Sequence, residues 1–92
     1  MAQANDDPVV IGLREQIAAL DRTIVDSVNR RLELVAELKR HKDERGLPFF
    51  DPDREAFLIA TLTDSNPGPL SNEGLRSFYT GLLALIKREL GQ

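Results

Sequence analysis

The feature that most constrains the fold is a long stretch, Val9 to about Arg45, that has no proline and only one glycine, Gly12. Within it, apolar residues recur at steps of three or four, the spacing of one face of a helix. The residues of this apolar stripe are Leu13, Ile17, Leu20, Ile24, Val28, Val35 and Leu38. One continuous helix would have about 37 residues and a length of roughly 55 Å, whereas a compact domain of this size is about 30 Å across. We therefore expect a second chain to cover the stripe, in a dimer or higher oligomer.

The rest of the chain predicts two shorter helices. Gly46 and Pro48 end the long helix, with the glycine at the left-handed exit position. A second helix is expected from Asp51 or Pro52 to about Asp64, and Ser71 is expected to cap a third helix after the turn cluster SNPGP. The residues expected on the inner faces of these two helices are Leu58, Ile59, Leu62, Leu75, Phe78, Tyr79, Leu82, Leu83, Ile86 and Leu90. The prediction is a single all-α domain over residues 1–92, with residues 1–8 flexible.

Composition excludes several classes of function. The chain has no cysteine and one histidine, His41, so it offers no disulfide, no cysteine nucleophile and no metal site. A net charge of −3 argues against nucleic acid as a partner. No uncharged run approaches 18 residues, and the first ten residues have no signal-peptide pattern. We expect a cytoplasmic protein that does not enter a membrane.

Two cations interrupt the apolar stripe of the long helix. Arg31 and Lys42 fall at its steps of three and four and lie eleven residues apart. Eleven residues make three helical turns with about 20° of drift, so the two side chains would share a face. Cations on an inward face are costly unless an anionic group meets them. The alternative is that their aliphatic stems lie along apolar surface while the charged groups reach water.

The segment DPDRE, residues 51–55, raises a related question. Asp51 and Pro52 are enough to start a helix, yet Arg54 and Glu55 follow where the apolar face should begin. From the residues alone, we expect a pocket for a small dianion, because guanidinium groups fix carboxylates and neighbouring acids accept hydrogen bonds. Its expected lining is Arg31, Lys42, Asp51, Arg54 and Glu55.

Arg14 is a further candidate for the same pocket. It precedes Lys42 by 28 residues, roughly 42 Å along a straight helix. The two side chains therefore cannot touch one small ligand within a single chain. In an antiparallel dimer, Arg14 would reach the pocket from the partner chain. The alternative is that Arg14 is a solvent-facing charge that pairs with a nearby acid.

The order and spacing of these residues resemble the all-helical, AroQ-type chorismate mutases. The likeness runs without a gap from Leu13 to about Leu83, through LREQIAALD, RRLEL, the lysine eleven residues after Arg31, DPDRE and NPGPLSNEGLRSFYTGLL. It implies an intertwined helical homodimer that converts chorismate to prephenate by an intramolecular Claisen rearrangement, without a cofactor. It also implies that Arg14 of the partner chain and Arg31 hold the two substrate carboxylates.

The resemblance implies roles for four more residues. Lys42 would donate to the ether oxygen of the breaking bond. Asp51 and Glu55 would meet the ring hydroxyl, and Arg54 would support the carboxylate cluster. Arg31, Lys42 and Glu55 are thus the expected catalytic residues. On this interpretation Arg54 and Glu55 both face inward because the pocket begins there.

The third helix departs from the family pattern. Most members have a small polar residue there, followed four positions later by Gln or Glu, whereas this chain has Ile86 and Leu90. Glu89 would reach the ether oxygen only if the last turn rotated, and we expect it to be solvated instead. The departure leaves room for an activating partner enzyme of the shikimate pathway. It also leaves three alternatives: a 4-amino-4-deoxychorismate mutase, an isochorismate-pyruvate lyase, or a helical domain that binds a metabolite or a partner without catalysis.

Overall fold

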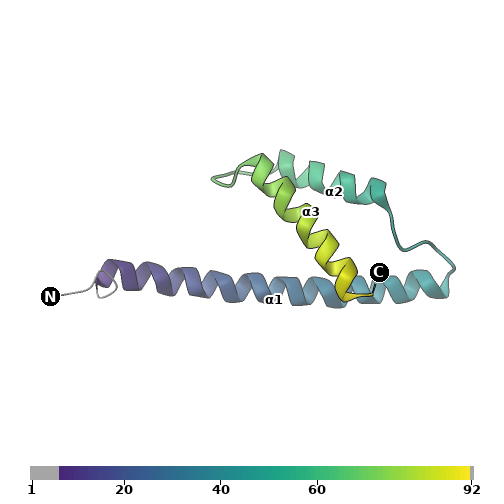
Figure 1. Cartoon of the computed structure of the whole chain (residues 1–92), viewed down its shortest axis with the longest axis horizontal. Coiled ribbons are helices and arrows are strands. Elements are labelled where there is room, and N and C mark those ends of the chain that lie inside the picture. The colour runs from purple at the N-terminus through teal and green to yellow at the C-terminus, as the bar shows by residue number, and fades with distance from the viewer. Residues whose placement is uncertain (1–6, 92) are drawn as a thin grey trace. The chain divides into compact units, whose positions relative to one another are not determined.

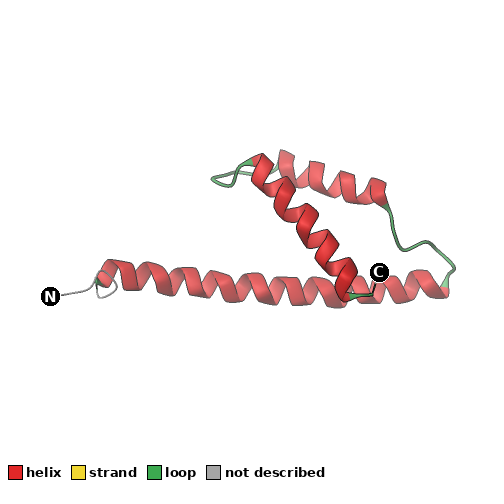
Figure 2. Cartoon of the chain, viewed as in Figure 1, coloured by secondary structure: helices red, strands yellow, loops and turns green. Residues whose placement is uncertain are grey.

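The structure is a computed structural model that describes residues 7–91, and across these residues it contains three helices and no strand. Helix α1 comprises Pro8–Glu44, α2 Pro52–Asp64 and α3 Asn72–Glu89 (Figures 1 and 2). The all-α prediction is confirmed, and the first helix has 37 residues without a break.

The described chain divides into two compact units between Leu34 and Val35, and α1 contributes to both. The first unit consists of the N-terminal part of α1. The second holds the end of α1 together with α2 and α3. Most of the segment expected to be flexible, residues 1–8, lies outside the described residues. Its last two residues, Asp7 and Pro8, are the cap and the first residue of α1.

Local signals explain where α1 starts and stops. The Asp7 carboxylate accepts the Val9 amide at 2.8 Å, and Pro8 occupies the first helical position, where no amide is needed. At the other end Gly46 has a φ of +66°, and the Leu47 amide donates to the Lys42 carbonyl at 2.8 Å. The predicted glycine exit is confirmed, because only glycine adopts this conformation without strain.

In the second unit α2 and α3 pack against each other and form an antiparallel helical hairpin (Figure 1). Both caps agree with the prediction: Asp51 accepts the Arg54 amide at 3.0 Å, and Ser71 accepts the Gly74 amide at 3.0 Å. The Asn66 side chain holds the connecting loop, because its amide donates to the Leu70 carbonyl at 2.7 Å and to the Asn72 side chain at 3.0 Å.

Few side chains are buried by the described chain itself. Leu75 and Ile86 are the buried hydrophobic residues, with 7% and 2% exposure. Most of the predicted inner faces of α2 and α3 are half-buried, but Phe78 is 54% exposed, so its predicted inward position is wrong within this chain. Helix α1 has no buried residue at all. The stripe residues Leu13, Ile17, Leu20 and Ile24 are each more than half exposed.

Candidate active site

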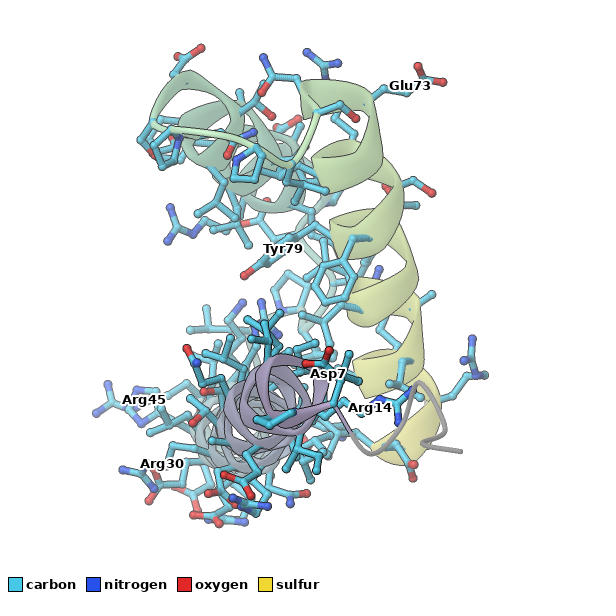
Figure 3. The ribbon with its side chains drawn as sticks, turned by 90° about the vertical axis from the view of Figure 1, so that its left-hand side faces the viewer. Asp7, Arg14, Arg30, Arg45, Glu73 and Tyr79 are labelled. Atoms are coloured by element: carbon cyan, nitrogen blue, oxygen red, sulfur yellow. The ribbon has the colours of Figure 1, made fainter. Side chains whose placement is uncertain are left out.

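The predicted site residues are divided between the two units. Arg14 and Arg31 belong to the first unit, where Arg14 is exposed and Arg31 is half-buried (Figure 3 shows Arg14). Lys42, together with the three charged residues of the DPDRE segment, belongs to the second unit.

Lys42 lies at the end of α1, beside the loop that leads to α2. Its ammonium donates to the Phe49 carbonyl at 3.3 Å, and the side chain is half-buried. This distance is longer than the ~2.7–2.9 Å typical of a charged donor on a charged acceptor. The contact fixes the position of the ammonium while leaving it able to exchange the carbonyl for an anionic oxygen.

The two residues at the start of α2 have structural roles that the sequence partly predicted. One oxygen of Asp51 is used as the helix cap, which leaves the second oxygen as an acceptor. Arg54 is exposed, and its guanidinium lies over the Phe57 ring, 5.5 Å from the centroid. Within this chain Glu55 is half-buried and Arg54 is exposed, and the prediction that both face a shared pocket stays a prediction. Adjacent helical residues point about 100° apart, and Glu55 is the one that turns inward.

Glu55 is held by a residue that the sequence prediction missed. The Lys87 ammonium lies 2.7 Å from Oε1 and 3.0 Å from Oε2 of Glu55, and it also lies 4.2 Å from the centroid of the Phe50 ring. The Glu55 side chain is 25% exposed and the Lys87 side chain 31%. Lys87 lies four residues after Leu83 and three before Leu90, which is the same spacing that identified Arg31 and Lys42. A search for cations on the apolar face of α3 would have found it.

The structure places the two residues at which α3 departs from the family pattern, Ile86 and Leu90, and their neighbour Glu89. Ile86 is 2% exposed, so it belongs to the small core of this unit. Leu90 follows the helix as its cap, and its amide donates to the Ile86 carbonyl at 3.0 Å. Glu89 is exposed, as expected for a solvated side chain. Near the end of α3, Lys87 contacts α2 through Glu55, whereas Glu89 is exposed.

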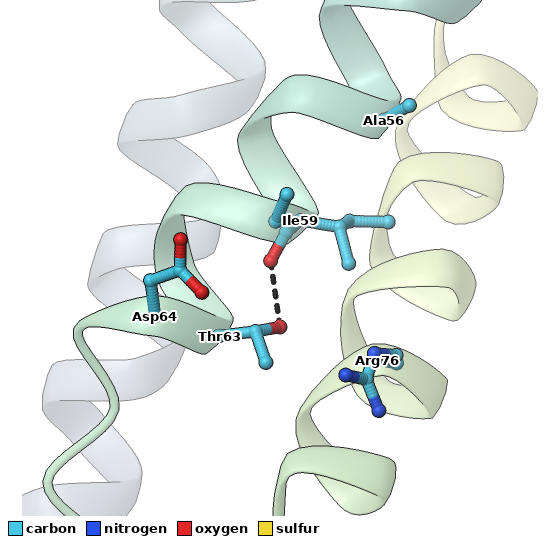
Figure 4. Close-up of a pocket in the computed structure, with 6 residues that line it drawn as sticks. Ala56, Ile59, Thr63, Asp64 and Arg76 are labelled. Atoms are coloured by element: carbon cyan, nitrogen blue, oxygen red, sulfur yellow. Dashed lines mark hydrogen bonds between the residues drawn. The ribbon is translucent and has the colours of Figure 1, made fainter.

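A pocket of about 370 Å³ lies elsewhere between α2 and α3 (Figure 4). Its lining comprises Ala56, Ile59, Ala60, Thr63, Asp64 and Arg76. Thr63 donates to the Ile59 carbonyl at 2.7 Å, so its hydroxyl is already satisfied as a donor. None of the predicted site residues lines this pocket, so it is separate from the Lys42 and Glu55 region.

Three of the cations in the described chain form ion pairs. Across residues 7–91 they are Arg30–Glu33, Lys39–Asp43 and Lys87–Glu55. The four predicted substrate-binding cations, Arg14, Arg31, Lys42 and Arg54, are absent from these pairs and remain available to an external anion. Five other cations are absent from the pairs as well: Arg22, Arg40, Arg45, Arg76 and Arg88. The same residues contain no group of three or more metal-ligating side chains. None of the helices described here combines the length and the apolar character needed to cross a membrane.

Comparison with known proteins identifies relatives over most of the chain. A family model described as chorismate mutase type II matches residues 13–89. A solved structure, chorismate mutase (form I) from Thermus thermophilus, has a TM-score of 0.82 and 34% identity over 84% of this chain and 96% of that chain.

Two curated relatives differ in their extent. The 4-amino-4-deoxychorismate mutase of Streptomyces venezuelae is 32% identical over 79 residues, which cover 85% of this chain and 73% of that protein. The T-protein of Enterobacter agglomerans is 45% identical over 49 residues, 53% of this chain. The match spans only 13% of the T-protein.

Proposed function

Because this chain belongs to the chorismate mutase type II family, we propose that it is a chorismate mutase, which converts chorismate to prephenate by an intramolecular Claisen rearrangement. The observation that carries the proposal is that Arg14, Arg31, Lys42 and Arg54, at the positions where the family binds a dicarboxylate, are all absent from the ion pairs among residues 7–91. The solved Thermus relative, which is named a chorismate mutase, supports the same activity.

The proposed roles follow the chemistry of each side chain. Arg31 and the partner chain's Arg14 hold the two carboxylates, since a planar guanidinium matches a carboxylate with two parallel hydrogen bonds. Arg54 swings from Phe57 to support them. Lys42 exchanges its Phe49 carbonyl for the ether oxygen of the substrate. Asp51 and Glu55 meet the ring hydroxyl, whose single proton is accepted by one carboxylate oxygen at a time. Lys42 and Arg31, with Glu55, act directly on the reacting molecule.

These roles suit a reaction that needs neither proton transfer nor a cofactor. Holding both carboxylates selects the compact conformer in which the two reacting carbons meet. As the ether bond breaks, its oxygen gains negative charge, and a fixed ammonium stabilises that charge more than it stabilises the ground state. A rate acceleration of about a millionfold corresponds to roughly 8 kcal/mol. Removing one such donor typically costs about 3 to 4 kcal/mol, so a few residues suffice.

The proposal includes a homodimer. Leu13, Ile17, Leu20 and Ile24 of α1 are each more than half exposed, and α1 buries no residue. A contiguous apolar surface of this kind is typical of an interface. A symmetric dimer would cover the same stripe of both chains and would bring Arg14 of each chain to the partner's site.

The direct test follows the loss of chorismate absorbance with purified protein, and identifies the product as prephenate. We expect turnover by the wild-type chain and at least a hundredfold less by Arg31→Ala. No turnover by a folded dimer would overturn the proposal and favour the non-catalytic binding domain. Release of pyruvate from isochorismate, with no conversion of chorismate, would favour the lyase.

A second candidate is a 4-amino-4-deoxychorismate mutase. It is favoured by the Streptomyces venezuelae relative, of which this chain covers 73%. That substrate has the same two carboxylates and the same ether, so the cations would serve it equally. The two candidates differ at the ring substituent, a hydroxyl in one and an amine in the other. An activating partner enzyme stays a prediction from the departures in α3.

A further inference from the structure

The pair of Glu55 and Lys87 is unlike the other ion pairs of residues 7–91. Arg30–Glu33 and Lys39–Asp43 each link neighbouring turns of α1, whereas Lys87 of α3 reaches Glu55 in the first turn of α2, 32 residues away. The pair is also mostly shielded from water, with 25% and 31% exposure. The roles proposed above use Glu55 and give none to Lys87.

We propose that Lys87 sets the specificity of the site for a neutral ring hydroxyl and against a ring ammonium. The inference rests on the proposed function, in which Glu55 meets the ring substituent. A lone carboxylate there would favour a cation. Glu55 paired with Lys87 carries no net charge, so the attraction of this carboxylate for an ammonium is lost.

The geometry allows the pair to receive a hydroxyl. Two carboxylate oxygens offer about four lone-pair positions. The Lys87 ammonium donates a hydrogen bond to Oε2 at 3.0 Å and lies 2.7 Å from Oε1. A position therefore remains for the single proton that a hydroxyl donates. An aliphatic amine is positively charged at neutral pH and would approach Glu55 beside the Lys87 ammonium. Like charges at a few ångströms repel strongly in a partly shielded site.

Phe50 restricts the movement that would relieve this repulsion. Its ring centroid lies 4.2 Å from the Lys87 ammonium, well within the ~6 Å range of a cation–π contact. Lys87 is thus held from one side by Glu55 and from another by the ring. The ammonium is therefore a fixed part of the site.

The test compares two substrates in matched variants. Lys87→Met removes the charge and keeps an unbranched apolar side chain. Lys39→Met is the control, because Lys39 also pairs with an acid, Asp43 at 2.9 Å, and lies 6.0 Å from the centroid of a phenylalanine ring, Phe49. We would measure kcat/KM for chorismate and for 4-amino-4-deoxychorismate. We expect the ratio of amine to hydroxyl substrate to rise at least tenfold, about 1.4 kcal/mol, in Lys87→Met and to stay unchanged in Lys39→Met.

Two further variants guard against loss of the fold. Lys87→Gln is a second neutral replacement, to be used if Lys87→Met does not melt cooperatively. Lys87→Arg keeps the charge and is expected to keep the preference for the hydroxyl. A residue that only links α2 to α3 would change both substrates in parallel and leave their ratio constant.

The outcomes separate this inference from the proposed function. Wild-type turnover of chorismate with an unchanged ratio in both neutral variants overturns the inference alone. A wild-type chain that prefers the 4-amino substrate also overturns it, because Lys87 would then fail to exclude the ammonium. Turnover of neither substrate by the folded wild-type dimer overturns the proposed function, and the inference falls with it.

Discussion

At the scale of the residue, Lys42 has the most demanding of the proposed roles, because its ammonium would have to stabilise the charge that develops on the ether oxygen. Its ammonium has a single hydrogen bond in the described chain, to the Phe49 carbonyl at 3.3 Å. A cation with one long contact to a neutral acceptor is stabilised further when an anionic oxygen replaces that acceptor. Lys42 belongs to the last turn of α1, so the helix limits the range of positions that its ammonium can reach. Lys42 thus has a hydrogen bond to a carbonyl and no ion pair among the described residues.

We predict that Lys42→Ala lowers kcat at least a hundredfold while the protein still melts cooperatively. Loss of one preorganised donor to the developing charge typically costs about a hundred- to a thousandfold. Lys39→Ala, three residues earlier on α1, is the control because its partner is Asp43 of the same helix. Initial rates at saturating chorismate, with thermal melts of both variants, make the comparison. An unchanged rate in Lys42→Ala would mean that this ammonium is merely a solvated cation.

The residue scale also shows where prediction from the sequence ended. Arg31 and Lys42 were identified because a cation at an apolar position is visible in the spacing along one helix. The same spacing on α3 identifies Lys87 as a cation at an apolar position. The family pattern instead singles out Ile86 and Leu90. What spacing does not reveal is the partner: Glu55 lies 32 residues before Lys87. Their contact depends on how α2 packs on α3.

At the scale of the element, helix boundaries were predictable because their signals are local. Asp51, Ser71 and Gly46 each act within three or four residues of their own position. Which side of α2 faces inward was less predictable, since that depends on α3. Arg54, for example, is exposed, and its guanidinium lies over the Phe57 ring of the same helix.

Asp51 combines a helix cap with a proposed role in binding, and the two can be separated. We predict that Asp51→Ala lowers the free energy of unfolding by about 1 kcal/mol, because the Arg54 amide loses its acceptor. Asp51→Asn keeps a good capping oxygen and is expected to retain the stability. It should still lower kcat/KM for chorismate several-fold, because a neutral oxygen is a weaker acceptor for the ring hydroxyl.

Urea unfolding at one fixed protein concentration measures the stability term, since a dimer's stability depends on concentration. Equal destabilisation by both Asp51 variants would show that the cap does not act through its side-chain oxygen. An unchanged kcat/KM in Asp51→Asn would assign Asp51 to the helix alone.

At the scale of the whole molecule, the described chain leaves many more large hydrophobic residues exposed than it buries. Leu75 and Ile86 are the buried hydrophobic residues of the described chain, while residues as large as Leu20 and Phe57 are at least 60% exposed. So small a core contributes little against the conformational entropy of ordering a domain of this size, which is one reason for the proposed homodimer. The exposed apolar stripe of α1 was predictable from the sequence, because a helix longer than a compact domain cannot be covered by its own chain.

The position of Arg14 makes the dimer a requirement for the proposed chemistry, and this can be tested by mixing two inactive variants. In Arg14→Ala every site lacks the guanidinium from the partner, and in Lys42→Ala every site lacks its ammonium. A heterodimer of the two has one site with both defects and one site with neither. This holds only if Arg14 acts on the partner's site, because within one chain each site would retain one defect.

We therefore predict that unfolding the two variants together and refolding them restores activity. Random pairing yields about half heterodimers with one intact site each, so the mixture should reach about a quarter of the wild-type rate per chain. Each variant refolded alone is the control and should stay at its own low rate. Absence of recovery, in a mixture shown by mass to contain heterodimers, would place Arg14 outside the partner's site. Arg31, Lys42 and Arg54 would then have to bind the dicarboxylate without it.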